Sequence, residues 1–368
     1  SVYSPFPNMV DTTKATPAQK ERYFKLMEDY YSNNPIENSS VFKNSELKKR
    51  CISAQINAVR TNIDRLPDKP TSYSYLALLY YGEGMLDEAV ANLTKSLQLK
   101  PDDAQNHYNL GLALETQGKI DDAVSQYNQA LQLNPNDTRA RYNLGNIFQS
   151  QGKFDKAISQ YRQVLQITPD DEKAHNNIAL ALYSQGKLDE AVYHYHRALQ
   201  IKPDFFEANY NLGSILSSQG KTDEAINCLR EALRLNPNDA EVHNNLAVIL
   251  LEQGKLNEAI DLFRQALKLK PDYAEPMYKL AEILATNPDP KVRDANQAIA
   301  LAERAADLTR HQDMTILEIL ANAYAAGGQF DKAVTITETA LNLASTAQNN
   351  EQAARIRSQL EFYKQSKH

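Results

Sequence analysis

The fold is decided by residues 104–137, which read AQNHYNLGLALETQGKIDDAVSQYNQALQLNPND. Three residue types of this stretch return every 34 residues along the chain. They are the prolines Pro67, Pro101, Pro135, Pro169, Pro203, Pro237 and Pro271, the glycines Gly84, Gly118, Gly152, Gly186, Gly220 and Gly254, and the alanines Ala89, Ala123, Ala157, Ala191, Ala225 and Ala259. A fixed period of this length is the signature of a solenoid. We therefore predict a stack of similar units instead of one central core.

Each period has the features of two helices joined by a tight turn. Asp103 can cap the first helix, Gly118 supplies the left-handed residue that ends it, and Pro135 ends the second helix because proline cannot continue one. The predicted core comprises His107, Leu110, Gly111 and Leu114 on the first helix, and Ala123, Tyr127, Ala130, Leu131 and Leu133 on the second. The pattern therefore predicts an all-α fold.

This pattern of small and large apolar residues resembles the tetratricopeptide repeat (TPR). The resemblance implies a right-handed superhelical solenoid of about eight helix-turn-helix repeats over residues 67–347. The expected repeats are 70–103, 104–137, 138–171, 172–205, 206–239, 240–273, 274–313 and 314–347, the seventh with a longer turn at 287–294.

Both ends of the chain lack the repeat's marks. Residues 1–66 read as an extended segment followed by capping helices at 17–33 and 43–66, and residues 348–368 read as a C-terminal capping helix. A solenoid needs such polar-backed ends to stay soluble. The alternative for the N-terminal part is a mobile arm, or a docking segment for a second copy.

Composition narrows the class of partner. The formal net charge is −6, which argues against nucleic acid, because a nucleic-acid partner requires a clustered basic face. No apolar run reaches the ~18 residues of a membrane span. The two cysteines, Cys51 and Cys228, read as reduced structural thiols.

One face of the repeats carries a row of asparagines. If Ala104 is position 1, positions 4, 7, 8 and 11 of the first helix form its predicted core, and positions 2, 6, 9 and 13 lie opposite. The TPR resemblance implies that this opposite side lines a concave groove. Position 6 is Asn109, Asn143, Asn177, Asn211 and Asn245. An amide both donates and accepts, and so complements a peptide backbone.

The row also resembles the asparagine ladder in the superhelical repeats of O-GlcNAc transferase. The alternative is an inherited repeat consensus with no ligand. Further candidate contacts beside the row are Tyr108, Arg139, Tyr142, Asn146 and Lys173. The groove is basic near Arg139 and Lys173 and acidic toward the C-terminus, which favours a polar ligand of mixed charge. A clamp for a C-terminal carboxylate by Arg139, Asn143, Lys173 and Asn177 is a weaker alternative.

The sequence offers nothing typical of catalysis. His194 and His196 are two residues apart on a helix, whereas a metal-binding pair requires four. No phosphate-binding, dinucleotide-binding or hydrolase motif occurs. We therefore predict a protein that is not an enzyme and has no cofactor or metal.

The leading hypothesis is a non-enzymatic scaffold or adaptor that binds an extended peptide or a flexible partner segment. Two alternatives stay open. One is a self-assembling structural scaffold that forms homo-oligomers through its ends. The other is the substrate-recruiting segment of a larger glycosyltransferase-type enzyme. A cytoplasmic location is expected for the first hypothesis, and an extracytoplasmic or membrane-associated one if the chain is part of a larger protein.

Overall fold

The computed structural model describes residues 45–63, 68–347 and 349–366. Within these residues every regular element is a helix, so the predicted all-α class is confirmed. The expected helix at 17–33 lies outside the described residues, whereas the one expected at 43–66 is represented by α2 (Ser45–Asn62).

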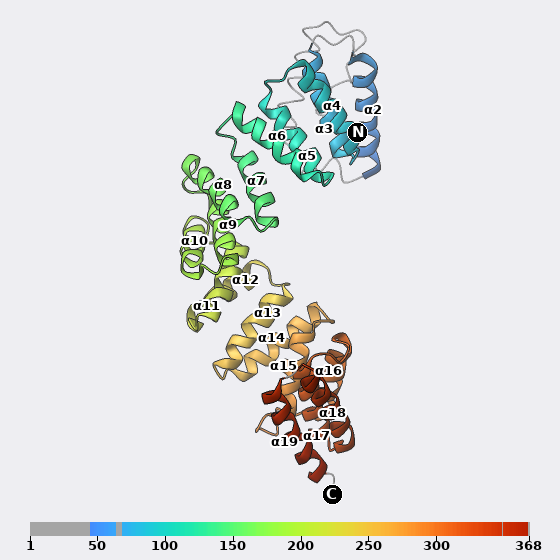
Figure 1. Ribbon diagram of the computed structural model, residues 1–368, viewed down its shortest axis with the longest axis vertical. Coiled ribbons are helices and arrows are strands. Elements are labelled where there is room, and N and C mark those ends of the chain that lie inside the picture. The colour runs from blue at the N-terminus through green and yellow to red at the C-terminus, as the bar shows by residue number, and fades with distance from the viewer. Residues whose placement is uncertain (1–44, 64–67, 348, 367–368) are drawn as a thin grey trace, which may run out of the picture. The chain divides into compact units, whose positions relative to one another are not determined.

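The remaining helices follow one another as antiparallel pairs joined by short turns (Figure 1). Their bounds are α3 Lys69–Gly82, α4 Leu86–Leu99, α5 Ala104–Thr116, α6 Ile120–Leu133, α7 Thr138–Ser150, α8 Phe154–Ile167, α9 Glu172–Ser184, α10 Leu188–Ile201, α11 Phe206–Ser218, α12 Thr222–Leu235, α13 Ala240–Glu252, α14 Leu256–Leu269, α15 Ala274–Thr286, α16 Ala295–Leu308, α17 Met314–Ala326, α18 Phe330–Thr346 and α19 Asn350–Ser366.

The chain divides into two compact units, Ser1–Pro169 and Asp170–His368, which we call unit 1 and unit 2. In each unit the two helices of a hairpin pack on each other, and each second helix packs on the first helix of the following hairpin. Contacts therefore run between neighbours along the stack, as in a TPR solenoid.

The caps and turns form as their residue types predict. The Asp103 side chain accepts a hydrogen bond from the backbone N–H of Asn106 at 3.0 Å, and Asp137, Asp171, Asp239 and Asp313 cap their helices in the same way. Gly118 has φ +77°, the left-handed conformation that ends a helix at little cost only for glycine. These local features give each hairpin its two straight helices and tight turn.

Small residues bring the two helices of a hairpin together. Ala123, Tyr127 and Ala130 are fully buried. A Cβ atom on Gly111 would lie 2.7 Å from Cε1 of Tyr127, so a larger residue would displace this ring. Leu133, in contrast, was expected in the core but is 43% exposed, because it lies at the end of α6 beyond the packed turns.

The buried stripe of the first helices is wider than expected. Positions 3 and 10 are buried as well as 7 and 8, as Ala140 and Ile147 show in α7. A first helix packs both on its own partner and on the second helix of the preceding hairpin, as α5 does on α6 and α4. The sequence prediction considered only one of these two interfaces.

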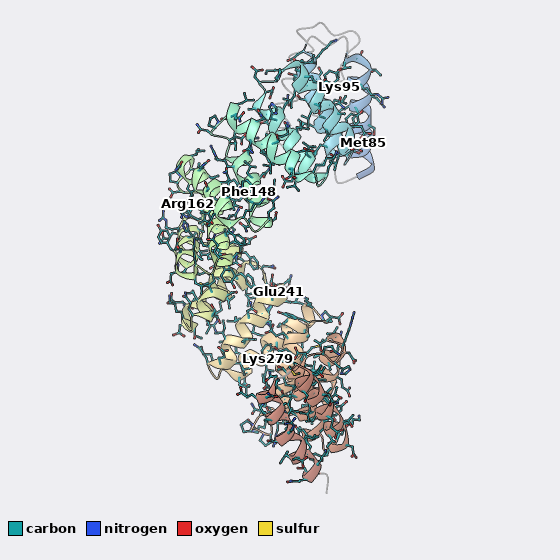
Figure 2. The ribbon with its side chains drawn as sticks, viewed as in Figure 1. Met85, Lys95, Phe148, Arg162, Glu241 and Lys279 are labelled. Atoms are coloured by element: carbon teal, nitrogen blue, oxygen red, sulfur yellow. The ribbon has the colours of Figure 1, made fainter. Side chains whose placement is uncertain are left out.

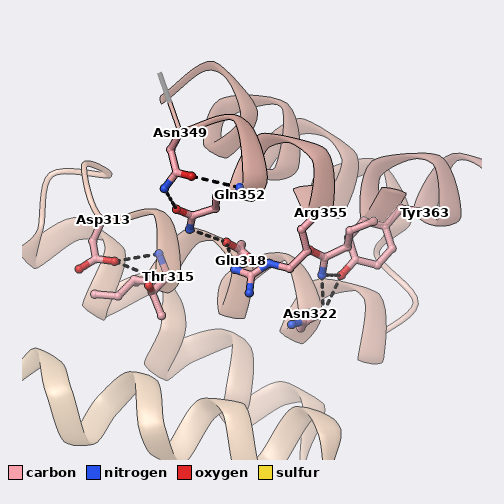
Figure 3. Close-up of polar contacts among 10 residues, drawn as sticks. Asp313, Thr315, Glu318, Asn322, Asn349, Gln352, Arg355 and Tyr363 are labelled. Atoms are coloured by element: carbon pink, nitrogen blue, oxygen red, sulfur yellow. Dashed lines mark hydrogen bonds and ion pairs between the residues drawn. The ribbon is translucent and has the colours of Figure 1, made fainter. Parts of the chain in front are cut away.

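Helix α19 closes the C-terminal end of unit 2. It buries Ala353, Ile356, Leu360 and Tyr363 and packs on α18. Its polar side chains reach α17, where Arg355 donates to both carboxylate oxygens of Glu318 at 2.9 and 2.8 Å (Figure 3). Gln359 and Tyr363 both donate to Oδ1 of Asn322. The last hairpin is therefore covered by apolar packing and by specific hydrogen bonds.

Candidate functional site

The candidate site is the side of the first helices that faces away from the hairpin core. We call it the first-helix face and define it by positions 2, 6, 9 and 13 of each repeat. The position 6 asparagines are all half-buried: Asn109 and Asn143 in unit 1, and Asn177, Asn211 and Asn245 in unit 2. The residues at position 13, from Thr116 to Thr286, are exposed. The sequence therefore placed this row correctly outside the core.

Asn143 also has a structural partner. Its Nδ2 donates to the hydroxyl of Tyr127 at 2.9 Å, and this hydroxyl donates to Oε2 of Glu115 at 2.6 Å. Burial, together with the Glu115 carboxylate, raises the pKa of Tyr127. The asparagine of α7 thus satisfies the polar end of a buried tyrosine in the preceding hairpin.

The other asparagines show related contacts. Nδ2 of Asn245 donates to the Tyr210 hydroxyl at 3.3 Å. Burial raises the pKa of Tyr195, and the nearby Asn211 side chain moderates this rise. Asn109 accepts from Nε2 of Gln105 at 2.8 Å, and Asn177 accepts from Nδ2 of Asn176 at 3.2 Å. The row is therefore partly occupied by contacts within the chain, which the sequence prediction did not include.

Arg139 is held by a neighbouring carboxylate. Its guanidinium donates to both oxygens of Asp137, at 3.1 and 2.8 Å, and lies over the Tyr108 ring at 4.5 Å from the centroid. Burial alone would raise the pKa of Asp137, but the hydrogen bonds from Arg139 and from two backbone amides outweigh it, so the pKa of this carboxyl lies below its usual range. The positive charge expected here is therefore largely compensated within the chain.

The remaining predicted contacts are divided between the units. In unit 1 the Tyr142 and Tyr161 rings lie 6.0 Å apart, and the Tyr161 hydroxyl donates to Oδ1 of Asn146 at 2.7 Å. In unit 2 Lys173 is exposed at the start of α9. The two positive residues expected side by side thus lie in different units.

A second repeating row, at position 14, did not enter the sequence predictions. Nε2 of Gln117, Gln219 and Gln253 donates to Oδ1 of an aspartate 30 residues upstream, namely Asp87, Asp189 and Asp223, at 2.9, 3.3 and 3.0 Å. Each bond joins the end of a first helix to the start of the preceding second helix. The signal was present, because Gln117, Gln151, Gln185, Gln219 and Gln253 share the 34-residue step.

The described residues contain no group of histidine, cysteine, aspartate and glutamate side chains arranged to hold a metal ion. His194 lies against His175 instead of His196, with 2.9 Å between the two Nδ1 atoms. Cys228 is a half-buried free thiol whose pKa burial raises to about 11. Across the same part of the chain, no helix combines the length and apolar character needed to cross a bilayer.

Family comparisons agree with this architecture. Models of the tetratricopeptide repeat match residues 104–137 and 78–118, and the model described as the cilia and flagella-associated protein 70 C-terminal domain matches residues 134–360. No curated protein matches the chain.

Two solved structures with TM-scores above 0.5 show the same fold at low identity. PilF of Pseudomonas aeruginosa is 19% identical with a TM-score of 0.52, over 58% of this chain and 97% of that chain. The C-terminal part of a TPR repeat-containing protein from Cytophaga hutchinsonii is 16% identical with a TM-score of 0.54, over 62% of this chain and 95% of that chain. YrrB, described as a TPR protein with an unusual peptide-binding site, is 20% identical with a TM-score of 0.44, over 51% and 96%.

The hairpin stack and the matching repeats define the chain as a TPR repeat protein. It belongs to the family of the cilia and flagella-associated protein 70 C-terminal domain, because that family's model matches more than half of its residues.

Proposed function

We propose that this protein is a non-enzymatic scaffold or adaptor that binds an extended peptide, or a flexible segment of a partner, along its first-helix face. TPR repeat families are generally non-enzymatic and bind protein or peptide partners, which supports the coarse assignment. The observation that carries the finer proposal is the row of five half-buried asparagines at one position of successive first helices.

The asparagine amides retain the capacity to bind a peptide. An amide has two N–H donors and an oxygen that accepts twice. Asn143 and Asn245 each use an Nδ2 donor on a tyrosine hydroxyl. Donor and acceptor positions therefore remain for a peptide N–H or C=O. The contacts within the chain also fix the orientation of each amide, which lowers the entropy lost when a ligand binds.

The spacing of the row suits an extended backbone. Neighbouring helices pack at about 8–10 Å, whereas a strand advances about 3.3 Å per residue. One amide would therefore meet about every third residue of the ligand. Because this contact is to the backbone, the neighbouring side chains, such as those of Tyr108 and Tyr142 in unit 1, would provide sequence preference.

A binding experiment in unit 2 tests this proposal. Peptides would be selected from a random library on the wild-type protein, and their Kd measured for the variant Asn177→Ala/Asn211→Ala/Asn245→Ala. Loss of two or three hydrogen bonds should weaken binding about 10- to 100-fold. The matched control is Asn227→Ala/Asn257→Ala/Asn342→Ala, which changes three exposed asparagines on second helices.

The control should bind like the wild type. Circular dichroism would verify that both variants keep their helical content. Unchanged affinity in the first variant, with the helices intact, would contradict a role for the asparagine row.

A further inference from the structure

The C-terminal part of the first-helix face in unit 2 is acidic. Position 2 of α11, α13 and α15 is a glutamate in each case, namely Glu207, Glu241 and Glu275, and Glu282 lies two turns further along α15. Glu207, Glu241 and Glu282 are exposed. Glu241 and the one lysine at position 6, Lys279, are labelled in Figure 2. We call this part, with its neighbouring tyrosines Tyr210, Tyr273 and Tyr278, the acidic segment.

The tyrosines lie close to these carboxylates. Burial raises the pKa of all three hydroxyls, and the carboxylates raise it further: Glu241 acts on Tyr210, Glu275 and Glu241 act on Tyr273, and Glu275 and Glu282 act on Tyr278. The pKa of Tyr273 reaches about 12. The rings therefore stay neutral and lie in a negative potential, and both features attract a cation to an aromatic face.

Buried amides position part of the segment. Asn244 is fully buried, and its Nδ2 donates to Oε2 of Glu275 at 3.0 Å. Its Oδ1 is also buried and has no hydrogen-bond partner among the described residues. Asn245 holds the Tyr210 hydroxyl. A carboxylate and a phenol of two different hairpins are thus fixed by a polar pair on the helix between them.

A lysine of the chain shows the chemistry that this surface favours. The Nζ atom of Lys270 lies 4.8 Å from the centroid of the Tyr273 ring and 3.7 Å from a carboxylate oxygen of Glu241. The face of the Tyr273 ring and the Glu241 carboxylate therefore both contact the ammonium group of Lys270. Lys279 likewise lies over the Tyr278 ring, with its Nζ atom 5.5 Å from the centroid. Glu207, Glu275 and Glu282 offer further carboxylates, for which the described residues show no ion pair, and the Tyr210 ring has no cation over it among these residues.

We infer that the acidic segment binds an extended stretch of a partner protein that is rich in lysine or arginine, with the basic side chains on the glutamates and tyrosines. This inference rests on the proposed function, because it assigns the chemistry of the peptide held by the same face. The glutamates recur once per hairpin, so basic residues about three apart in an extended strand would match them.

Fluorescence anisotropy with defined peptides tests the inference. The probe is a labelled 12-residue peptide, roughly the length that spans four hairpins at a strand's rise, with lysine at every third position and glycine or serine between. A glutamine and a glutamate version of the same peptide are compared with it. We expect the lysine peptide to bind at least about tenfold more tightly than the glutamine one, with the difference decreasing at high salt.

Two charge-matched variants locate the site. Glu207→Gln/Glu241→Gln/Glu282→Gln removes exposed carboxylates from the acidic segment. Glu190→Gln/Glu224→Gln/Glu258→Gln removes three exposed carboxylates from the second helices. Each variant removes the ion-pair partner of one basic residue, Lys270 in the first and Arg230 in the second. The first variant should weaken binding of the lysine peptide about tenfold, whereas the second should leave it nearly unchanged. Equal effects of both variants would overturn the inference.

The asparagine variant Asn177→Ala/Asn211→Ala, which leaves the contact between Asn245 and Tyr210 intact, separates this inference from the proposed function. If the lysine and glutamine peptides bind equally well and both lose affinity in this variant, the proposed function stands and the inference is wrong. If only the lysine peptide binds, and this variant does not affect it, the acidic segment is supported and the asparagine row is not. Binding of none of these peptides overturns the inference, whereas the proposed function is decided by the peptides selected from the library.

Discussion

Asp137 combines two functions in one side chain. It caps α7 by accepting from the backbone amides of Arg139 and Ala140, and it pairs with the guanidinium of Arg139. Its carboxylate is almost fully buried, whereas the Arg139 side chain is half exposed. The cap could be predicted from the residue type, but the ion pair between the buried Asp137 carboxylate and the Arg139 guanidinium could not.

We expect Asp137→Ala to destabilise α7 by about 1–2 kcal/mol at neutral pH, through loss of the cap and of the ion pair. Asp103→Ala, which removes a cap bonded to one amide and a more exposed ion pair with Lys100, serves as the control and should destabilise its helix less. Because the pKa of Asp137 is lowered by folding, its stabilisation is present above the ordinary carboxyl pKa and is lost as the pH falls through the folded value. Hydrogen exchange at several pH values measures this, in the α7 amides for the Asp137 variant and in the α5 amides for the Asp103 variant. An equal difference between the two variants at every pH would contradict the role of the charge.

The Nδ1 atoms of His175 and His194 cannot both carry a proton and keep their contact. Their Nδ1 atoms are 2.9 Å apart, so one nitrogen has to accept while the other donates. The equivalent pair two hairpins upstream is His107 with Gln126, whose Nδ1 and Oε1 atoms are 2.8 Å apart. An amide can accept from a histidine whether or not that ring carries a second proton.

We therefore expect the α9–α10 hairpin to be less stable when both rings are protonated, because both Nδ1 atoms would then be donors. His194→Gln, which reproduces the histidine–glutamine pair of the upstream repeat, should remove much of this acid sensitivity. Hydrogen exchange of α9 and α10 at pH 7.5 and 5 would show it. His196→Gln, an exposed neighbour, is the control. Wild-type acid sensitivity in the His194 variant would contradict the prediction.

At the scale of elements, the glutamine at the end of each first helix joins neighbouring hairpins. Gln253 reaches Asp223 in the preceding second helix, although the two residues are 30 positions apart. The 34-residue period identifies the row of glutamines and the row of aspartates. It does not show that the glutamine of one hairpin contacts the aspartate of the preceding one. The partner depends on how far one hairpin is displaced along the next.

Gln253→Ala should lower the stability of the contact between α12 and α13 by about 1 kcal/mol, the usual contribution of one hydrogen bond. Gln265→Ala changes an exposed glutamine of the same repeat and should have less effect. Urea unfolding followed by circular dichroism compares the two. If the two substitutions lower the free energy of unfolding by the same amount, the hydrogen bond between Gln253 and Asp223 contributes nothing to stability.

At the scale of the whole molecule, stability is expected to be local. The described helices contact mainly their neighbours along the chain, so no single core connects distant hairpins. In such proteins stability is approximately a sum of repeat and interface contributions. The predicted caps, turns and small residues recur in most hairpins, so the fold class could be predicted from one period. The exceptions are the first helices α11 and α15, which have no side-chain cap, and the α15–α16 turn, which has no left-handed glycine.

Leu229→Ala in α12 therefore should destabilise its own neighbourhood by about 3–5 kcal/mol, because the side chain is fully buried. Amide exchange should accelerate in α11 to α13 and change little in α18 and α19. Exchange mass spectrometry of the full chain measures both regions at once. Equal acceleration throughout unit 2 would show that its hairpins unfold together instead.

The sequence by itself determined the helical hairpin, its caps and turns, and the side of the first helix that carries the asparagines. These features depend on a helix period of 3.6 residues and on local steric preferences, which are properties of short segments. Only the tertiary structure decided that Asn143 holds Tyr127, that Asp137 compensates Arg139, and that Gln253 meets Asp223. The Asn143 and Gln253 contacts join neighbouring hairpins and depend on how one packs against the next, whereas the Arg139 contact depends on which rotamer its guanidinium adopts beside a buried cap.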